Sequence, residues 1–136
     1  MPLAATPREW YWAAMPNAVE KAVDTYVRAW SEPDGAVRAR MLEECFAADG
    51  RIVALRSEIR GRAALAEFMT SFLADPTLLG VRMTSALDAG ATTFRYRSSI
   101  DRRDGTSREF LDAGEIDASG RIALLLVFAG RLDELT

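Results

Sequence analysis

Apolar residues recur every three or four positions in three segments of the first half of the chain, and this spacing predicts three amphipathic helices. The first helix follows Asn17 and the second follows Asp34, two residues whose side chains commonly cap helices. We expect the second helix to end near residues 48–50 and the third to run from Gly61 to just before Pro76. The apolar positions are Val19, Ala22, Val23, Tyr26, Val27 and Trp30 in the first helix, Val37, Met41, Leu42, Cys45 and Phe46 in the second, and Leu65, Phe68, Met69, Phe72 and Leu73 in the third.

Period-two alternation replaces the helical spacing from Gly80 onward and predicts four long strands. Turn residues at 88–90, 104–105 and 117–120 separate these strands, so consecutive strands form an antiparallel meander. A short β-rich run at residues 51–55 predicts one further strand between the second and third helices. The order helix, helix, strand, helix and four strands indicates an α+β fold in which three helices pack on a curved antiparallel sheet.

The last predicted strand, residues 121–132, is apolar at both its odd and its even positions. An antiparallel sheet usually leaves one face in water, so an apolar pattern on both faces requires a cover on each. The helices cover one face, and we expect a second copy of the chain to cover the other. The sequence therefore predicts a homodimer through the outer face of the sheet.

Asp112 is an acid in the middle of an otherwise apolar strand. If the turn at 117–120 holds two or four residues, Asp112 pairs across the hairpin with Leu125. Burial among apolar neighbours should raise the pKa of this carboxyl unless a cation reaches it. The residues that share its face are Phe110, Gly114, Ala123, Val127 and Ala129.

The turn at Asp104–Gly105 decides what faces Asp112 on its other side. A two-residue turn places Arg97 opposite Asp112 and forms a buried ion pair. A three-residue turn with a bulge places Tyr96 there, and Phe94 and Tyr96 then line a pocket. We favour the second register, and the choice between a catalytic and a purely structural role for Asp112 stays open.

Composition narrows the possible functions. The chain has 136 residues, a net charge of −3 and a pI near 5.0, so it offers no bulk attraction to nucleic acid or to anionic membranes. No apolar run approaches the ~20 residues that a membrane-spanning helix needs, and the N-terminus lacks a secretory pattern. We expect one domain over residues 1–136 and a cytoplasmic protein.

Histidine is absent, which excludes catalytic triads and imidazole-ligated zinc sites. Cys45 is the only cysteine and Lys21 the only lysine, and neither lies at a position that favours nucleophilic chemistry. Oxygen ligands do not cluster on one predicted face, so we expect no metal ion and no cofactor. Acid–base chemistry would fall to Asp, Glu or Tyr.

Residues 1–16 form an N-terminal arm with three prolines and the aromatic cluster Trp10–Trp12. Aromatic residues so close together favour a packed environment. The arm either covers the mouth of the pocket or packs on the core or on a partner subunit, and we favour the second interpretation.

The element order and two local motifs resemble the nuclear transport factor 2-like fold, and more narrowly the SnoaL-like polyketide cyclases and ketosteroid isomerases. The motifs are Gly-x-x-x-Leu-x-x-Phe at residues 61–68 and Gly-Arg-Ile at residues 120–122. The resemblance covers roughly residues 17–132. It implies a cone-shaped, cystatin-like fold that encloses an apolar pocket.

The resemblance also implies site residues. Tyr26 and Asp112 match the pair that stabilises an oxyanion in the isomerases, a pair whose neutral acid is a known case of a carboxyl kept protonated by its apolar site. The position of the isomerase general base corresponds to Ala54, so Glu58 is the candidate substitute if the strand extends that far. We expect the pocket to be lined by Trp30, Ala54, Phe68, Met69, Phe72, Phe94, Tyr96, Phe110, Leu125 and Val127.

Three functions fit these expectations. The first is acid–base chemistry on a small hydrophobic molecule through Asp112 and Tyr26, as an isomerase, a cyclase or an epoxide hydrolase. The second is a pocket that binds a small hydrophobic ligand without changing it. The third is a dimeric interaction module whose cavity its own side chains fill.

Overall fold

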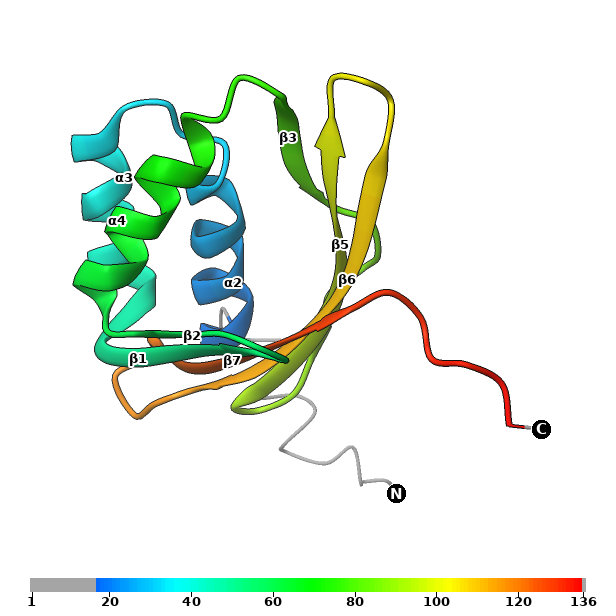
Figure 1. Cartoon of the computed structure of the whole chain (residues 1–136). Coiled ribbons are helices and arrows are strands. Elements are labelled where there is room, and N and C mark those ends of the chain that lie inside the picture. The colour runs from blue at the N-terminus through cyan, green and yellow to red at the C-terminus, as the bar shows by residue number, and fades with distance from the viewer. Residues whose placement is uncertain (1–16, 136) are drawn as a thin grey trace.

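The computed structural model describes residues 17–135, and the predicted arm with Trp10–Trp12 lies outside this range. Three helices pack together beside one face of a curved sheet (Figure 1). Asn17 caps the first helix by accepting a 2.8 Å hydrogen bond from the Val19 amide, and Asp34 caps the second by accepting one of 2.9 Å from the Ala36 amide. These two predicted caps are confirmed. The helices are α2 (Ala18–Ala29), α3 (Gly35–Cys45) and α4 (Arg62–Leu73).

Seven strands form a single sheet in the order β2-β1-β7-β6-β5-β3, and β4 pairs with β5. The predicted meander is confirmed, because β3, β5, β6 and β7 pair in an antiparallel manner. The sheet as a whole is mixed, since β1 runs parallel to β7. The strands are β1 (Phe46–Ala54), β2 (Glu58–Arg60), β3 (Leu78–Met83), β4 (Asp88–Ala89), β5 (Thr93–Arg102), β6 (Ser107–Ile116) and β7 (Ile122–Ala129).

Several predicted boundaries are wrong: β1 begins at Phe46 rather than at residue 51, and β7 ends at Ala129 rather than at residue 132. Two further errors have a physical reason. The second helix ends at Cys45 rather than near 48–50, because Phe46 continues its apolar spacing but already pairs with Ile122 in the sheet. Asp88–Ala89 is not a turn but the short strand β4, because the chain reverses only after it, where the Gly90 amide donates a hydrogen bond to the Thr93 carbonyl. The three-residue strand β2 was also missed, since two of its residues are charged.

The core lies between the helices and the sheet. Val19 and Leu42 of the helices and Ile122 and Leu125 of β7 are fully buried. The sheet curves, so that β1 and β7 lie beneath the helices while β3, β5 and β6 rise beside them (Figure 1). This curvature leaves space between the upper sheet and the helices. No helix within residues 17–135 is long and apolar enough to cross a membrane.

Candidate functional site

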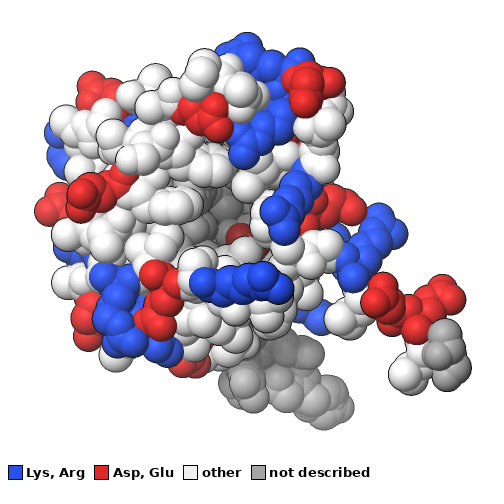
Figure 2. Space-filling model, viewed as in Figure 1, with Lys and Arg blue, Asp and Glu red and all other residues white. Residues whose placement is uncertain are grey.

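A cavity of about 410 Å³ lies between the concave face of the sheet and helices α2 and α4. Its walls are mostly apolar, and six of the lining residues are aromatic. Figure 2 shows it as a hollow with white walls and a red acidic atom deep inside. Its volume is within the range of about 300–1,000 Å³ that is typical of small-molecule sites.

The β5–β6 hairpin brings Asp112 to this cavity. Gly105 has a φ of 91° and accommodates a three-residue turn, in which Arg102 donates its amide to the Thr106 carbonyl. Tyr96 therefore lies opposite Asp112, and Arg97 lies on the other face of the sheet. The favoured register is confirmed, and the buried Arg97–Asp112 ion pair is excluded.

The partner of Asp112 on β7 is Val127, not Leu125 as predicted. The register shifts between Glu115 and Ile116, next to the turn, and the turn-based count did not include this irregularity. The net displacement on β7 is two residues, so Asp112 keeps the inward face that we expected. The same shift makes the predicted position of Ala123 wrong. Ile122 and Leu125, not Ala123, are the fully buried residues of that part of β7.

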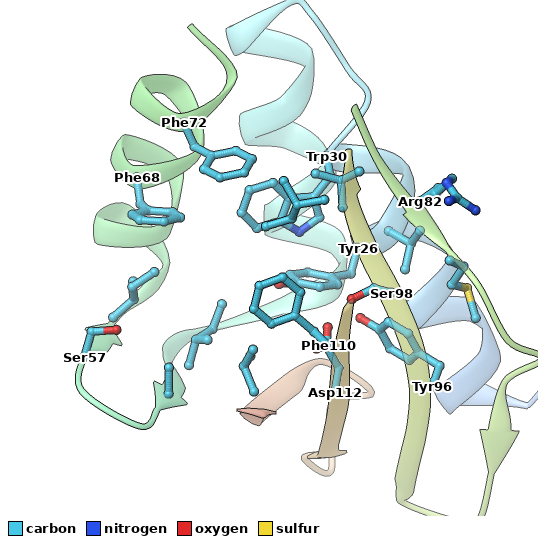
Figure 3. Close-up of a pocket in the computed structure, with 18 of the residues that line it drawn as sticks. Tyr26, Trp30, Ser57, Phe68, Phe72, Arg82, Tyr96, Ser98, Phe110 and Asp112 are labelled. Carbon is cyan, nitrogen blue, oxygen red and sulfur yellow. The ribbon is translucent and has the colours of Figure 1, made fainter. Parts of the chain in front are cut away.

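Asp112 is a buried acid, and one of its carboxyl oxygens has no hydrogen-bond partner within residues 17–135. Its residue is 8% exposed, and its Oδ1 atom is buried with no hydrogen-bond partner among the described residues. Burial raises the pKa of this carboxyl to about 6, and the neighbouring Tyr96 hydroxyl partly offsets the rise. Figure 3 shows the hydroxyls of Tyr96 and Ser98 close to the carboxyl, all directed into the cavity. The site thus combines one proton-exchanging group with two hydroxyls.

Tyr26 lines the same cavity from α2, so the structure brings the two predicted catalytic residues together. Its ring stacks on Phe46 at 6.4 Å and meets the edge of Trp30 at 6.3 Å. Burial, together with the charge of Asp112, raises the pKa of Tyr26 well above its ordinary value. Tyr26 therefore stays a neutral hydrogen-bonding group at any physiological pH.

Seven of the ten residues that we expected to line the pocket do so, namely Trp30, Ala54, Phe68, Phe72, Tyr96, Phe110 and Val127. The other three are core residues instead. Phe94 stacks beneath Tyr96 at 6.2 Å and closes against Gly114, while Met69 and Leu125 are fully buried between the helices and the sheet. Phe94 and Leu125 do face the interior, as predicted. They lie too far along their strands to reach the cavity, which the sequence did not indicate.

Several lining residues were not predicted. Ser98 and Ile100 follow Tyr96 at steps of two along β5, so strand parity alone would have identified them. Arg82 and Met83 lie on β3, the edge strand; the predicted meander placed this strand at the edge, but it did not indicate that the curved sheet brings the edge to the cavity. The remaining unpredicted lining residues are Val27, Ile52, Ser57, Ile59 and Val81.

Ala54, the residue at which the resemblance predicted the isomerase base, lines the cavity with its methyl group. Glu58 also reaches the cavity, but the strand does not extend that far, because β1 ends at Ala54 and β2 turns back along it. The Glu58 carboxylate is held by Arg60 at 2.7 Å and by Arg51 at 3.5 Å. Across residues 17–135, no group of three or more potential metal ligands is close enough to hold an ion.

No protein-family model matches the chain. A search of the curated proteins likewise finds no match. Solved structures do resemble it. A putative isomerase of the SnoaL-like family from Agrobacterium tumefaciens str. C58 has a TM-score of 0.73 at 19% identity, over 85% of this chain and 100% of the other.

Two further structures support the same fold. An LEH-like epoxide hydrolase from M. tuberculosis has a TM-score of 0.63 at 15% identity, over 84% of this chain and 83% of the other. An NTF2-like protein of unknown function from Exiguobacterium sp. 255-15 has a TM-score of 0.61 at 17% identity, over 82% of this chain and 99% of the other. The chain therefore has the nuclear transport factor 2-like, cystatin-like fold that its sequence motifs indicated.

The environment of Asp112 predicts a pH-dependent cost in stability. Its pKa rises from 3.8 in the unfolded chain to about 6 in the folded one, so ionised Asp112 costs about 3 kcal/mol of stability above pH 6. This cost disappears as the pH falls below about 4, where both states are protonated. We expect Asp112→Asn to be more stable than the wild type by about 1–3 kcal/mol at pH 8 and nearly equal at pH 4.

Urea unfolding at the two pH values measures this difference. Glu115→Gln is the matched control, because Glu115 is exposed on the same strand and the change should alter stability by less than about 0.5 kcal/mol. A destabilised Asp112→Asn variant at both pH values would show that the carboxyl holds the fold together.

Proposed function

We propose that this protein binds a small, largely apolar molecule in the cavity and holds the one polar group of that molecule against Asp112. The observation that carries the proposal is the buried, unpartnered Oδ1 of Asp112 at the floor of an apolar hollow. A buried polar atom without a partner is costly, and a ligand with a hydrogen-bonding group would satisfy it. The aromatic walls supply the hydrophobic contact area for the rest of the molecule.

The walls support a cavity that persists without a ligand. The ring of Trp30 meets Phe72 edge-on at 5.4 Å and Phe68 edge-on at 6.3 Å, and Phe68 and Phe72 stack at 5.9 Å. Rings held against one another in this way resist collapse into the space beside them. A molecule can therefore bind without first opening the core, which lowers the cost of binding.

Acid–base chemistry is a second candidate function, and the pKa of Asp112 favours it. A carboxyl with a pKa near 6 exchanges protons readily close to neutral pH. Proton transfer would serve isomerisation or the opening of an epoxide, and a putative SnoaL-like isomerase and an LEH-like epoxide hydrolase share this fold. Ala54 at the place of the isomerase base supports binding alone, so binding remains the first proposal.

The outer face of the sheet supports a homodimer. Phe128 on this face is 54% exposed, and it pairs with Leu111 in the sheet. Arg97 and Glu115 lie on the same face, so two copies related by a two-fold axis could place opposite charges together. The outward apolar residues of β6 and β7 are Leu111, Ala113, Leu124, Leu126 and Phe128.

The first test is ligand binding with 2-substituted naphthalenes that carry a hydroxymethyl, an acetyl or an aminomethyl group. We expect at least one to bind the wild type, measured by calorimetry, and Ala54→Phe to weaken that binding at least tenfold by filling the cavity. Ala63→Phe on the exposed side of α4 should bind like the wild type. Absence of binding by all three compounds would refute the proposed function.

The second test separates chemistry from binding. If the site performs acid–base chemistry, the wild type will accelerate exchange of the α-protons of 2-tetralone in D₂O, followed by NMR, and Asp112→Asn will lose this acceleration, because general acid–base catalysis contributes roughly 100-fold or more. Glu115→Gln should retain it. Equal acceleration by Asp112→Asn, or no acceleration by the wild type, would refute the catalytic function and leave only the binding function.

The third test is the oligomeric state. We expect sedimentation to give a dimer for the wild type and a monomer for Phe128→Glu, since a buried charge opposes association. Leu55→Glu is the control, because Leu55 is 91% exposed in the loop after β1. A monomeric wild type at about 50 µM would contradict the proposed dimer.

A further inference from the structure

The charged groups that line the cavity are unequally satisfied. Glu58 is paired with two arginines, and Arg82 is paired with Asp101 at 2.6 Å. Figure 3 shows the Arg82 guanidinium directed away from the centre of the cavity. Asp112 is the exception among the lining residues, because its Oδ1 atom has no partner in the described chain. The cavity thus contains one uncompensated acidic group.

No basic side chain of the described chain compensates Asp112. Its pKa is set by burial and by the Tyr96 hydroxyl, with no contribution from an arginine or lysine. Arg108 lies over the ring of Phe110, 5.6 Å from its centroid, but Arg108 is exposed and does not line the cavity. A carboxylate in apolar surroundings is stabilised most by a cation that is also shielded from water.

The walls suit a cation as well. Six aromatic side chains line the cavity, and the faces of such rings attract ammonium groups when water is excluded. The aromatic residues are Tyr26, Trp30, Phe68, Phe72, Tyr96 and Phe110. An uncompensated acid combined with aromatic walls is complementary to an apolar molecule that carries a positive charge.

Given the binding function proposed above, we propose that the ligand is a hydrophobic amine, whose ammonium group pairs with the Asp112 carboxylate while its apolar body packs against the aromatic walls. The ammonium donates a hydrogen bond to Oδ1, the atom that lacks a partner. Tyr96 keeps its hydrogen bond to the carboxylate, and the Ser98 hydroxyl lies close to it (Figure 3).

Other ligand classes fit this arrangement less well. An anionic ligand would be repelled by Asp112 and by Glu58. A neutral carbonyl compound only accepts hydrogen bonds, so it can pair with Asp112 itself only when that carboxyl is protonated, and the carboxyl is mostly ionised above its pKa of about 6. An alcohol can donate to Oδ1, but it leaves the negative charge uncompensated.

The two main alternatives predict opposite responses to pH. An ammonium ligand binds the ionised form of Asp112, so its affinity rises as the pH increases through 6 and falls as the pH decreases. A carbonyl ligand binds the protonated form and shows the reverse. The titratable groups that face Asp112 are Tyr26 on α2 and Tyr96 on β5, and both have pKa values raised above the ordinary value, so neither titrates between pH 5 and 8. Glu58 and Arg82 line the same cavity as paired ions.

Calorimetric titration with three matched probes tests the proposal: 2-naphthylmethylamine, 2-naphthylmethanol and 2-acetylnaphthalene. At pH 7.5 we expect the wild type to bind the amine at least tenfold more tightly than the alcohol. At pH 5.0 only about a tenth of Asp112 is ionised, so the affinity for the amine should fall about tenfold. Asp112→Asn should bind the amine and the alcohol equally, while Glu115→Gln should keep the preference.

The outcomes separate this proposal from the proposed function. Binding of the ketone or the alcohol as tightly as the amine at pH 7.5 would overturn the amine proposal and leave the binding function intact. Retention of the amine preference by Asp112→Asn would overturn it as well. The pH dependence of the wild type decides the question even if the variant does not fold. Failure of all three probes to bind would refute both proposals.

Discussion

The register of the β5–β6 hairpin is the constraint on which the site depends. A three-residue turn at Gly105 pairs Tyr96 with Asp112, and this pairing leaves a carboxyl among apolar side chains. A shift of one residue would place Arg97 there instead and turn every β5 side chain to the opposite face. The cavity would then hold a closed ion pair, and neither proton exchange nor recognition of a polar ligand group would follow from it.

The sequence predicted the fold well because strong local signals specify it. Helical spacing, the caps at Asn17 and Asp34 and the turn residues between strands all depend on neighbours that are close along the chain. Such signals do not report which distant strands pair. The parallel pairing of β1 with β7 therefore went unpredicted. The short strands β2 and β4 pair with strands close to them in the sequence, and they were missed for a different reason: two of the three residues of β2 are charged, and β4 was assigned to a turn.

The site was predicted in part for the same reason. Alternation along a strand fixes the face of a residue, so Asp112, Tyr96 and Val127 were correctly placed toward the interior. Depth is a different property, because it depends on how the sheet curves and on which helix covers each position. Phe94 and Leu125 share the inward face but lie where the helices close over the sheet, and they belong to the core. Sequence alternation contains no signal for this difference.

Stability and function make opposite demands on Asp112. An ionised carboxyl at this depth weakens the fold, and within the described chain no ion pair or hydrogen bond of Oδ1 compensates the cost. The fold tolerates this ionised carboxyl because its other stabilising interactions do not depend on Asp112. The helix caps and the buried core contacts of Val19, Leu42 and Leu65 lie elsewhere. A group that destabilises the empty protein becomes favourable once a partner enters the cavity, since the same desolvation that raises its pKa strengthens its interaction with a complementary ligand. The unsatisfied carboxyl is therefore better explained by the proposed ligand than by what the fold requires.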